Sequence, residues 1–198
     1  WREQKLIQKR KASADLLSLG FSTFFLNRTN RSGILTGGVI GGIEQKGNYK
    51  IGCRFNKVAL IERIQRIARL KHRIQLYHLD ALSLIETINK ESSNANTLVY
   101  FDPPYYAKGS TLYMNYFDDG QHLALAQAIR KIKTIHWMVS YDAEKAIMDL
   151  YDWVREKRVK HFDLNRFAYK KRVGKEVLFF SDDLKMGADL SPQFAKMS

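Results

Sequence analysis

The sequence predicts an α/β fold in which buried parallel strands alternate with helices. Two uncharged runs of β-branched, aliphatic and aromatic residues, Thr97–Phe101 and Ile135–Ser140, have the composition of buried strands. Helices are expected over 57–70, where apolar residues recur at the helical period, and over 119–132 and 143–151. Strands and helices in this order are typical of a mainly parallel sheet covered by helices.

The composition limits the classes of protein to which the chain can belong. Its 198 residues are 45% hydrophobic, which is enough for one substantial domain with a packed core. The net charge of +13 suggests a polyanionic partner, although a solvated basic surface would give the same charge. The single cysteine, Cys53, excludes a disulfide framework and a cysteine metal cluster, so we expect no metal and a cytoplasmic location. We find neither a signal peptide nor an apolar run of the roughly 18 residues that a membrane helix needs.

The first part of the chain is expected to be helical over residues 1–26, with a possible break at Gly20. Residues 33–53 are predicted to form a β-hairpin or a long loop. Its glycine-rich stretch, Gly37–Gly42, neither follows a buried strand nor opens a helix. A flexible connector is therefore favoured there over a phosphate-binding loop.

A polar turn, Asn27–Gly33, joins the helical segment to this loop and carries Arg28, Asn30 and Arg31. Arginine and asparagine are the side chains that recognise guanine and adenine edges, and arginine also binds phosphates. We therefore predict that these three residues contact nucleic acid.

The helix over 57–70 begins after Asn56, a residue type that caps helices. We assign one face of this helix to the core, because its apolar residues repeat at helical spacing: Val58, Ile61, Ile64, Ile67 and Leu70. A short strand is predicted over 74–78, and Asp80 follows it directly. Asp80 either accepts a hydrogen bond from a cofactor's amino or ribose hydroxyl group or caps the next helix, and the sequence favours neither role.

The segment Asp102–Pro103–Pro104–Tyr105 follows the first buried strand at once, at the sheet edge where open α/β proteins bind ligands. The prolines end the strand and restrict the backbone of the turn. A plain turn would use the same residue types. A nucleobase amino group, however, is a poor nucleophile, because its lone pair is conjugated with the ring. The Asp102 carboxylate and the Pro103 carbonyl can accept its two hydrogens, and the Tyr105 ring can stack on a flipped base.

Two later segments carry basic residues in arrangements that suit contact with nucleic acid. Residues 106–117 interleave aromatic and basic side chains, and Lys108, Tyr113 and Tyr116 are candidates for stacking and phosphate contact. An antiparallel hairpin of residues 159–167 and 176–181 would carry three further candidates at its tip. These are Lys170, Lys171 and Arg172.

The D-P-P-Y segment resembles the motif of the amino-group DNA methyltransferases, which use S-adenosylmethionine. In that family Asp at the position of Asp102 is typical of adenine enzymes, whereas Ser is typical of cytosine enzymes and Asn of RNA or protein methylation. The preceding region resembles the target-recognition region of Dam-type adenine methyltransferases. The residues that carry this second resemblance are Leu26-Asn27-Arg28, Arg31-Ser32-Gly33, Tyr49 and Arg54-Phe55-Asn56.

The resemblance implies a Rossmann-like methyltransferase fold with a mostly parallel sheet, one reversed strand and an inserted helical and β-hairpin module for DNA recognition. Residues 1–55 would form the target-recognition region, 56–185 the catalytic region and 186–198 a loosely ordered tail. The implied activity is site-specific methylation of double-stranded DNA, as in restriction–modification, on the N6 amino group of a flipped adenine. Asp102, Pro103, Pro104 and Tyr105 would be catalytic, and Asp80 and Asp102 would contact S-adenosylmethionine.

The sequence departs from the family in one respect. The family's glycine-rich cofactor motif should precede the recognition region, and nothing before Asn27 fits it. We therefore expect a carboxyl-terminal part of a longer enzyme, in which an N-terminal segment completes the fold and the strand over 98–101 lacks one neighbour. A non-catalytic DNA-binding fragment is the alternative function, and Asp102 weighs against a third, methylation of RNA or cytosine.

Overall fold

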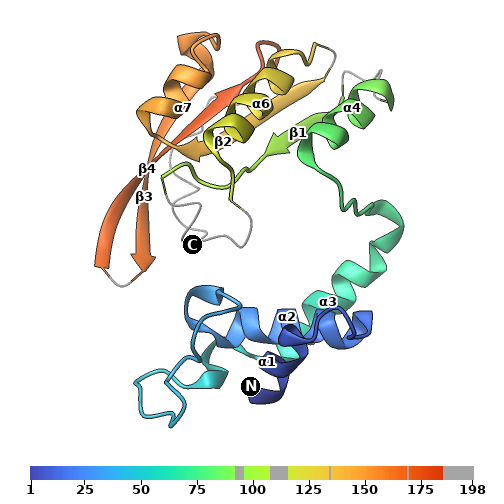
Figure 1. Cartoon of the computed structure of the whole chain (residues 1–198), viewed down its shortest axis with the longest axis vertical. Coiled ribbons are helices and arrows are strands. Elements are labelled where there is room, and N and C mark those ends of the chain that lie inside the picture. Colours follow the sequence, from blue (N-terminus) through green and yellow to red (C-terminus); the bar gives the residue numbers. More distant parts are fainter. Residues whose placement is uncertain (92–95, 108–115, 134, 169, 185–198) are drawn as a thin grey trace. The chain divides into compact units, whose positions relative to one another are not determined.

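The computed structural model of the protein describes residues 1–91, 96–107, 116–133, 135–168 and 170–184 (Figure 1). The chain divides into two compact units, Trp1–Leu76 and Tyr77–Ser198. None of the described helices has both the length and the apolar character needed to cross a membrane.

The first unit begins with two helices, α1 (Arg2–Lys9) and α2 (Leu16–Thr29). The break between them is at residues 10–15 and not at Gly20, which lies inside α2. The Asp15 carboxylate caps α2 by accepting a hydrogen bond from the Ser18 N–H at 3.0 Å. A glycine within a helix costs only about 1 kcal/mol, so Gly20 does not end α2. The buried Ser22 hydroxyl joins the two helices by donating to the Gln4 carbonyl at 2.8 Å.

Residues 30–54 form a long loop, the second of the two predicted alternatives. Its regular structure is an isolated bridge between Asn30 and Val39 and two short 3-10 helices, η1 (Arg31–Gly33) and η2 (Ile51–Arg54). The loop is built around the Gln45 side chain, whose amide donates to the carbonyls of Ile40 at 2.8 Å and Gly42 at 2.6 Å. Its amide oxygen accepts from the Ile51 N–H at 2.7 Å, so this segment is tied together by hydrogen bonds.

Helix α3 (Lys57–Arg69) begins as predicted, because the Asn56 side chain accepts from the Ala59 N–H at 3.2 Å. The assignment of its apolar face to the core is wrong. Val58 is 68% exposed and Ile67 60%, and Leu60 is the buried residue of this helix. Helical spacing shows that these side chains share a face, but it does not show that another element covers that face.

The strand predicted over residues 74–78 does not form. After the short helix η3 (Lys71–Arg73), residues 74–80 have no strand pairing in the described chain, and Leu76 is 92% exposed. An apolar run becomes a strand only when a neighbouring strand accepts its backbone hydrogen bonds.

The second unit contains a four-stranded mixed sheet in the order β1-β2-β4-β3. Its elements are α4 (Ala81–Glu91), β1 (Leu98–Phe101), α6 (Asp119–Arg130), β2 (His136–Asp142), α7 (Lys145–Leu150), η4 (Glu156–Arg158), β3 (Val159–Ala168) and β4 (Lys170–Phe180). Strands β1 and β2 are parallel, whereas β4 is antiparallel to both β2 and β3. The predicted α/β class and the two predicted strands are therefore confirmed, and β2 is buried as expected. The burial predicted for β1 is wrong: Leu98 and Tyr100 are each 52% exposed, and β1 stands at the end of the sheet order.

The core of this unit lies between the sheet and three helices. Side chains from α4, α6 and α7 pack with those of β2 and β4 in one cluster, which includes Ile85, Ile129, Val139, Ile147 and Phe179. Asp118 caps α6: its carboxylate accepts from the Gln121 N–H at 2.8 Å, and the Gln121 side chain accepts from the Asp118 N–H at 3.0 Å.

The β3–β4 hairpin is longer than the sequence indicates. Strand β4 pairs with β2 only over residues 176–180, whereas its pairing with β3 continues to Lys170. Residues 170–174, expected in the turn, are therefore part of a two-stranded ribbon that continues beyond β2 (Figure 1).

Gly41 is the position where the loop of the first unit requires glycine. Its φ is +85°, and a Cβ there would lie 2.6 Å from the Tyr49 carbonyl oxygen. We expect Gly41→Ala to lower the free energy of unfolding by about 1–3 kcal/mol, the usual cost of a strained backbone conformation. Urea denaturation followed by circular dichroism measures this change.

The matched control is Gly38→Ala, because a Cβ at Gly38 meets nothing within 4 Å and the backbone there is not left-handed. This variant should be neutral or slightly more stable, since alanine restricts the unfolded chain. Equal stabilities for the two variants would contradict the account of Gly41.

Candidate active site

The D-P-P-Y turn begins where β1 ends, at Phe101. Parallel pairing of Phe101 with Val139 brings the carboxyl ends of β1 and β2 to the same edge of the sheet. The Asp102 side chain is exposed there, and Pro103 is buried beneath the turn. The turn thus presents its carboxylate to solvent while its backbone is held against the protein.

A chain of hydroxyl groups orients the Asp102 carboxylate. The Ser140 hydroxyl of β2 donates to Asp102 Oδ1 at 3.1 Å, and the Tyr100 hydroxyl lies 2.8 Å from Ser140 Oγ. Because Ser140 gives its one hydrogen to the carboxylate, Tyr100 is the donor to Ser140. This arrangement fixes one oxygen of the Asp102 carboxylate.

The tyrosine of the turn and the residues after it are held by two further carboxylates. The Tyr105 hydroxyl donates to Glu176 Oε1 of β4 at 2.6 Å. The buried Asp142, at the end of β2, accepts from the backbone N–H of Tyr106 at 2.8 Å and of Ala107 at 3.0 Å. The turn is therefore anchored at Asp102, at the Tyr105 side chain and at the main chain that follows.

The start of α6 packs against the same segment through His122. This histidine is 1% exposed, and its Nδ1 lies 2.9 Å from the Tyr141 hydroxyl. Its ring contacts those of Tyr106 and Phe117, with centroids 5.3 and 5.4 Å away. The Asp119 carboxylate beside the Tyr106 hydroxyl raises the pKa of Tyr106.

Asp80 caps α4, since its Oδ1 accepts from the Leu82 N–H at 2.9 Å. It also lines a hollow of about 230 Å³ between the starts of α4 and α6, with Phe117 and Gln121 on the other side. The two interpretations of Asp80 are thus compatible in space, because capping uses one carboxylate oxygen. Phe117, which lines the hollow, contacts His122, and His122 contacts Tyr106 next to the D-P-P-Y turn.

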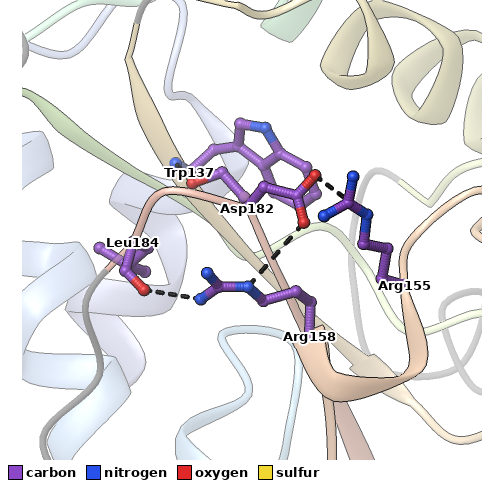
Figure 2. A network of polar contacts seen from close by, with 6 residues as sticks. Trp137, Arg155, Arg158, Asp182 and Leu184 are labelled. Atoms are coloured by element: carbon purple, nitrogen blue, oxygen red, sulfur yellow. Dashed lines mark hydrogen bonds and ion pairs between the residues drawn. The ribbon is translucent and has the colours of Figure 1, made fainter.

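A larger hollow, of about 480 Å³, lies at the opposite edge of the sheet, where β2 begins at His136. Figure 2 shows the ion pairs beside it: Arg155 and Arg158 approach the Asp182 carboxylate at 3.6 and 3.9 Å. Arg158 also donates to the Leu184 carbonyl at 2.7 Å. Ligands of α/β sheets bind at the carboxyl ends of parallel strands, so we do not assign this hollow to the active site.

The predicted DNA contacts of the polar turn differ in their surroundings. Asn30 is fully buried: its Oδ1 accepts from Trp1 Nε1 at 2.6 Å, and its Nδ2 donates to the Ile34 carbonyl at 2.8 Å. It holds the turn together, so we leave it out of the DNA interface. Arg28 is half-buried and donates through Nε to the Arg54 carbonyl at 3.0 Å, whereas Arg31 is exposed.

Of the later candidates, Tyr116 is 56% exposed. Lys108 and Tyr113 lie outside the described residues. Lys170, Lys171 and Arg172 occupy the ribbon end of β4, opposite Ala168, Phe167 and Arg166. No cluster of three metal-ligating side chains is found in the described part of the chain.

Sequence reasoning missed the residues that hold the turn: Ser140, Asp142 and Glu176. Ser140 and Asp142 lie at the end of the second predicted strand. Parallel pairing of that strand with the one before Asp102 would have predicted that they lie near the turn. Nothing local marks Glu176, because its position depends on the antiparallel register of β4 with β2.

A mixed α/β sheet with a D-P-P-Y turn at the carboxyl edge of its parallel strands is the arrangement expected of an amino-group DNA methyltransferase. The chain belongs to the D12 class N6 adenine-specific DNA methyltransferase family, whose family model matches residues 9–164. This match confirms the resemblance found in the sequence. A search of curated proteins finds no match to the chain.

The burial of His122 predicts a pH-dependent stability. Burial lowers the pKa of His122 below its ordinary value of about 6.5 and outweighs the opposite effect of Asp142, Asp119 and Asp118. As the pH falls below about 6.5, the unfolded chain therefore binds more protons than the folded chain, and the free energy of unfolding decreases. Chemical denaturation between about pH 7.5 and about pH 5.5 should show this decrease.

His122→Asn should reduce the slope of the free energy of unfolding against pH in that interval. The exposed His72 provides the control, and His72→Asn should leave the slope as in the wild type. An unchanged slope in the His122 variant would mean that His122 is not the group responsible.

Proposed function

We propose that this member of the family methylates the N6 amino group of an adenine flipped out of double-stranded DNA, with S-adenosylmethionine as the methyl donor. The observation that carries the proposal is the D-P-P-Y turn, whose carboxylate is oriented by Ser140 and whose tyrosine is held by Glu176. The family supports adenine-specific DNA methylation, and the turn supplies the groups that such a reaction needs.

The two acceptors of the turn would act on the adenine amino group. The Asp102 carboxylate and the Pro103 carbonyl would each accept one hydrogen, which favours a pyramidal nitrogen and frees its lone pair. Since Ser140 orients the Asp102 carboxylate before the base arrives, little reorganisation of this acceptor would accompany the reaction. The amino nitrogen would bond to the methyl carbon as the methyl–sulfur bond breaks, and Asp102 would accept the proton released from the nitrogen.

S-adenosylmethionine supplies an electrophilic methyl group on a positively charged sulfur. The residues around Asp80 fit its adenosine end, because the hollow combines a carboxylate with apolar side chains of Leu82, Ala124 and Leu125. A carboxylate at the edge of an α/β sheet can accept from ribose hydroxyl or amino groups. The fold of residues 77–184 would then belong to a Rossmann-like methyltransferase domain.

DNA binding would rest on basic and aromatic residues. Arg31 of the polar turn, Tyr116 and the basic ribbon residues 170–172 are the candidates, and Lys108 and Tyr113 are predicted to join them. The net charge of +13 supports binding of a polyanion. The first unit would serve as the recognition module, in which Arg28 donates to the Arg54 carbonyl and Arg31 is exposed.

Asp102→Ala should reduce methyl transfer at least about a hundredfold, because the variant loses the group that acts on the amino nitrogen. DNA affinity should change little, since phosphate contacts dominate it. Transfer of labelled methyl groups from S-adenosylmethionine to double-stranded DNA measures the rate, and fluorescence anisotropy measures the affinity.

Asp149→Ala is the control for this variant, because it removes an exposed carboxylate that pairs with Lys145 in α7. A rate above about a tenth of the wild type for Asp102→Ala would overturn the role of Asp102. Wild-type chain that binds DNA but transfers no methyl groups would instead establish the alternative, a non-catalytic DNA-binding protein.

Arg31→Ala should weaken DNA binding. If Arg31 contacts a base, discrimination at one position should fall by about 1–3 kcal/mol, and if it contacts phosphate, affinity should fall on all sequences. Lys145→Ala removes the same charge from α7 and serves as the control in titrations at several salt concentrations. Equal affinities for both variants and the wild type would remove Arg31 from the interface.

A further inference from the structure

Two carboxylates lie side by side across neighbouring strands at the active-site edge of the sheet. Asp142 at the end of β2 pairs in register with Glu176 of the antiparallel β4. Like charges directly opposite each other destabilise an antiparallel pair. Two carboxylates at these positions therefore indicate that each is stabilised by hydrogen-bond donors nearby.

Both carboxylates bind the D-P-P-Y turn, but they hold different parts of it. Asp142 accepts from the main chain after the turn, at the N–H groups of Tyr106 and Ala107. Glu176 accepts from the Tyr105 hydroxyl at 2.6 Å, a length typical of a strong hydrogen bond to a charged group. Asp142 thus fixes the backbone on which Tyr105 stands, and Glu176 fixes the far end of its side chain.

A tyrosine ring has two rotatable bonds between the backbone and the ring. With the backbone held and the hydroxyl tethered, both rotations of Tyr105 are restrained and the plane of the ring is set. The Asp102 carboxylate is oriented separately by Ser140. The stacking face and the hydrogen-bond acceptor are therefore fixed relative to the same pair of strands, β2 and β4.

We propose that Glu176 is a positioning residue for base capture: its carboxylate holds the Tyr105 hydroxyl and so sets the plane of the ring on which the flipped adenine stacks. This inference rests on the proposed function. It assigns a role to the Tyr105 hydroxyl, in addition to the ring face. Misplacement of a bound group by about 1 Å can cost about a hundredfold in rate, so ring orientation affects the methyl-transfer step.

The test compares Glu176→Ala, Glu176→Gln and Tyr105→Phe in the full chain. Glu176→Ala and Tyr105→Phe should each lower kcat about tenfold or more, with the Kd for DNA within about twofold of the wild type, because phosphate contacts remain. Glu176→Gln keeps an oxygen that can accept from the hydroxyl, and it should recover most of the rate. Glu86→Ala, which removes an exposed glutamate from α4, is the matched control.

The double variant separates positioning from independent effects. If Glu176 acts through the Tyr105 hydroxyl, Glu176→Ala combined with Tyr105→Phe should be no slower than either variant alone. The fluorescence of 2-aminopurine at the target base should fall in the same variants, since a misoriented ring captures the flipped base less well. Multiplied defects in the double variant, or wild-type kcat and fluorescence in Glu176→Ala, would overturn the proposal.

A measurement on the free protein distinguishes failure of this inference from failure of the proposed function. Aromatic ¹³C relaxation should show an ordered Tyr105 ring in the wild type and in Glu176→Gln, and a mobile ring in Glu176→Ala. A ring equally ordered in all three proteins would overturn the positioning role, whatever the activity. The other outcome is a ring whose order depends on Glu176 in a protein whose wild type transfers no methyl groups. That outcome would support the positioning of Tyr105 by Glu176 and overturn the proposed function.

Discussion

The parallel pairing of β1 with β2 is the constraint on which the rest of the site depends. Because the two strands run in the same direction, Asp102 and Asp142 leave the sheet at the same edge. The antiparallel register of β4 then brings Glu176 beside Asp142. A shift of β4 by one residue would turn Val177 and Phe179 out of the core and Glu176 to the other face, so the packed core enforces the register that the site needs.

Some residues of the core also contact the site, so the stability of the core affects the geometry of the site. Tyr141 is fully buried, yet its hydroxyl reaches the His122 Nδ1, and His122 in turn packs against Tyr106. On the side of β4, the ring of Phe179 stacks on that of Tyr151 at 4.5 Å. Burial of these aromatic rings supplies the free energy that holds β2 and β4 in place, and the polar groups at the strand ends then orient the turn.

How far the sequence predicts the structure depends on how local each feature is. The D-P-P-Y turn, its strand and the Asn56 cap follow from neighbouring residues, and the structure contains them. The strand over 74–78 and the buried face of α3 required a partner element, which spacing alone does not reveal, and both predictions are wrong. Asn30 has the residue type of a base contact but closes a turn. Ser140 and Glu176 become neighbours of the turn only through pairing between distant strands.

The charge distribution separates DNA affinity from the chemistry under the proposed function. The chain carries a net charge of +13, yet the site edge presents Asp102, Asp142 and Glu176 from neighbouring strands. Carboxylates repel phosphates, so the DNA backbone would be held by basic residues elsewhere, such as Arg31. The same carboxylates attract an amino group, which offers only hydrogens. Of these acids, Asp142 and Glu176 already accept hydrogen bonds from the turn, which leaves Asp102 as the carboxylate that is both exposed and oriented for a base.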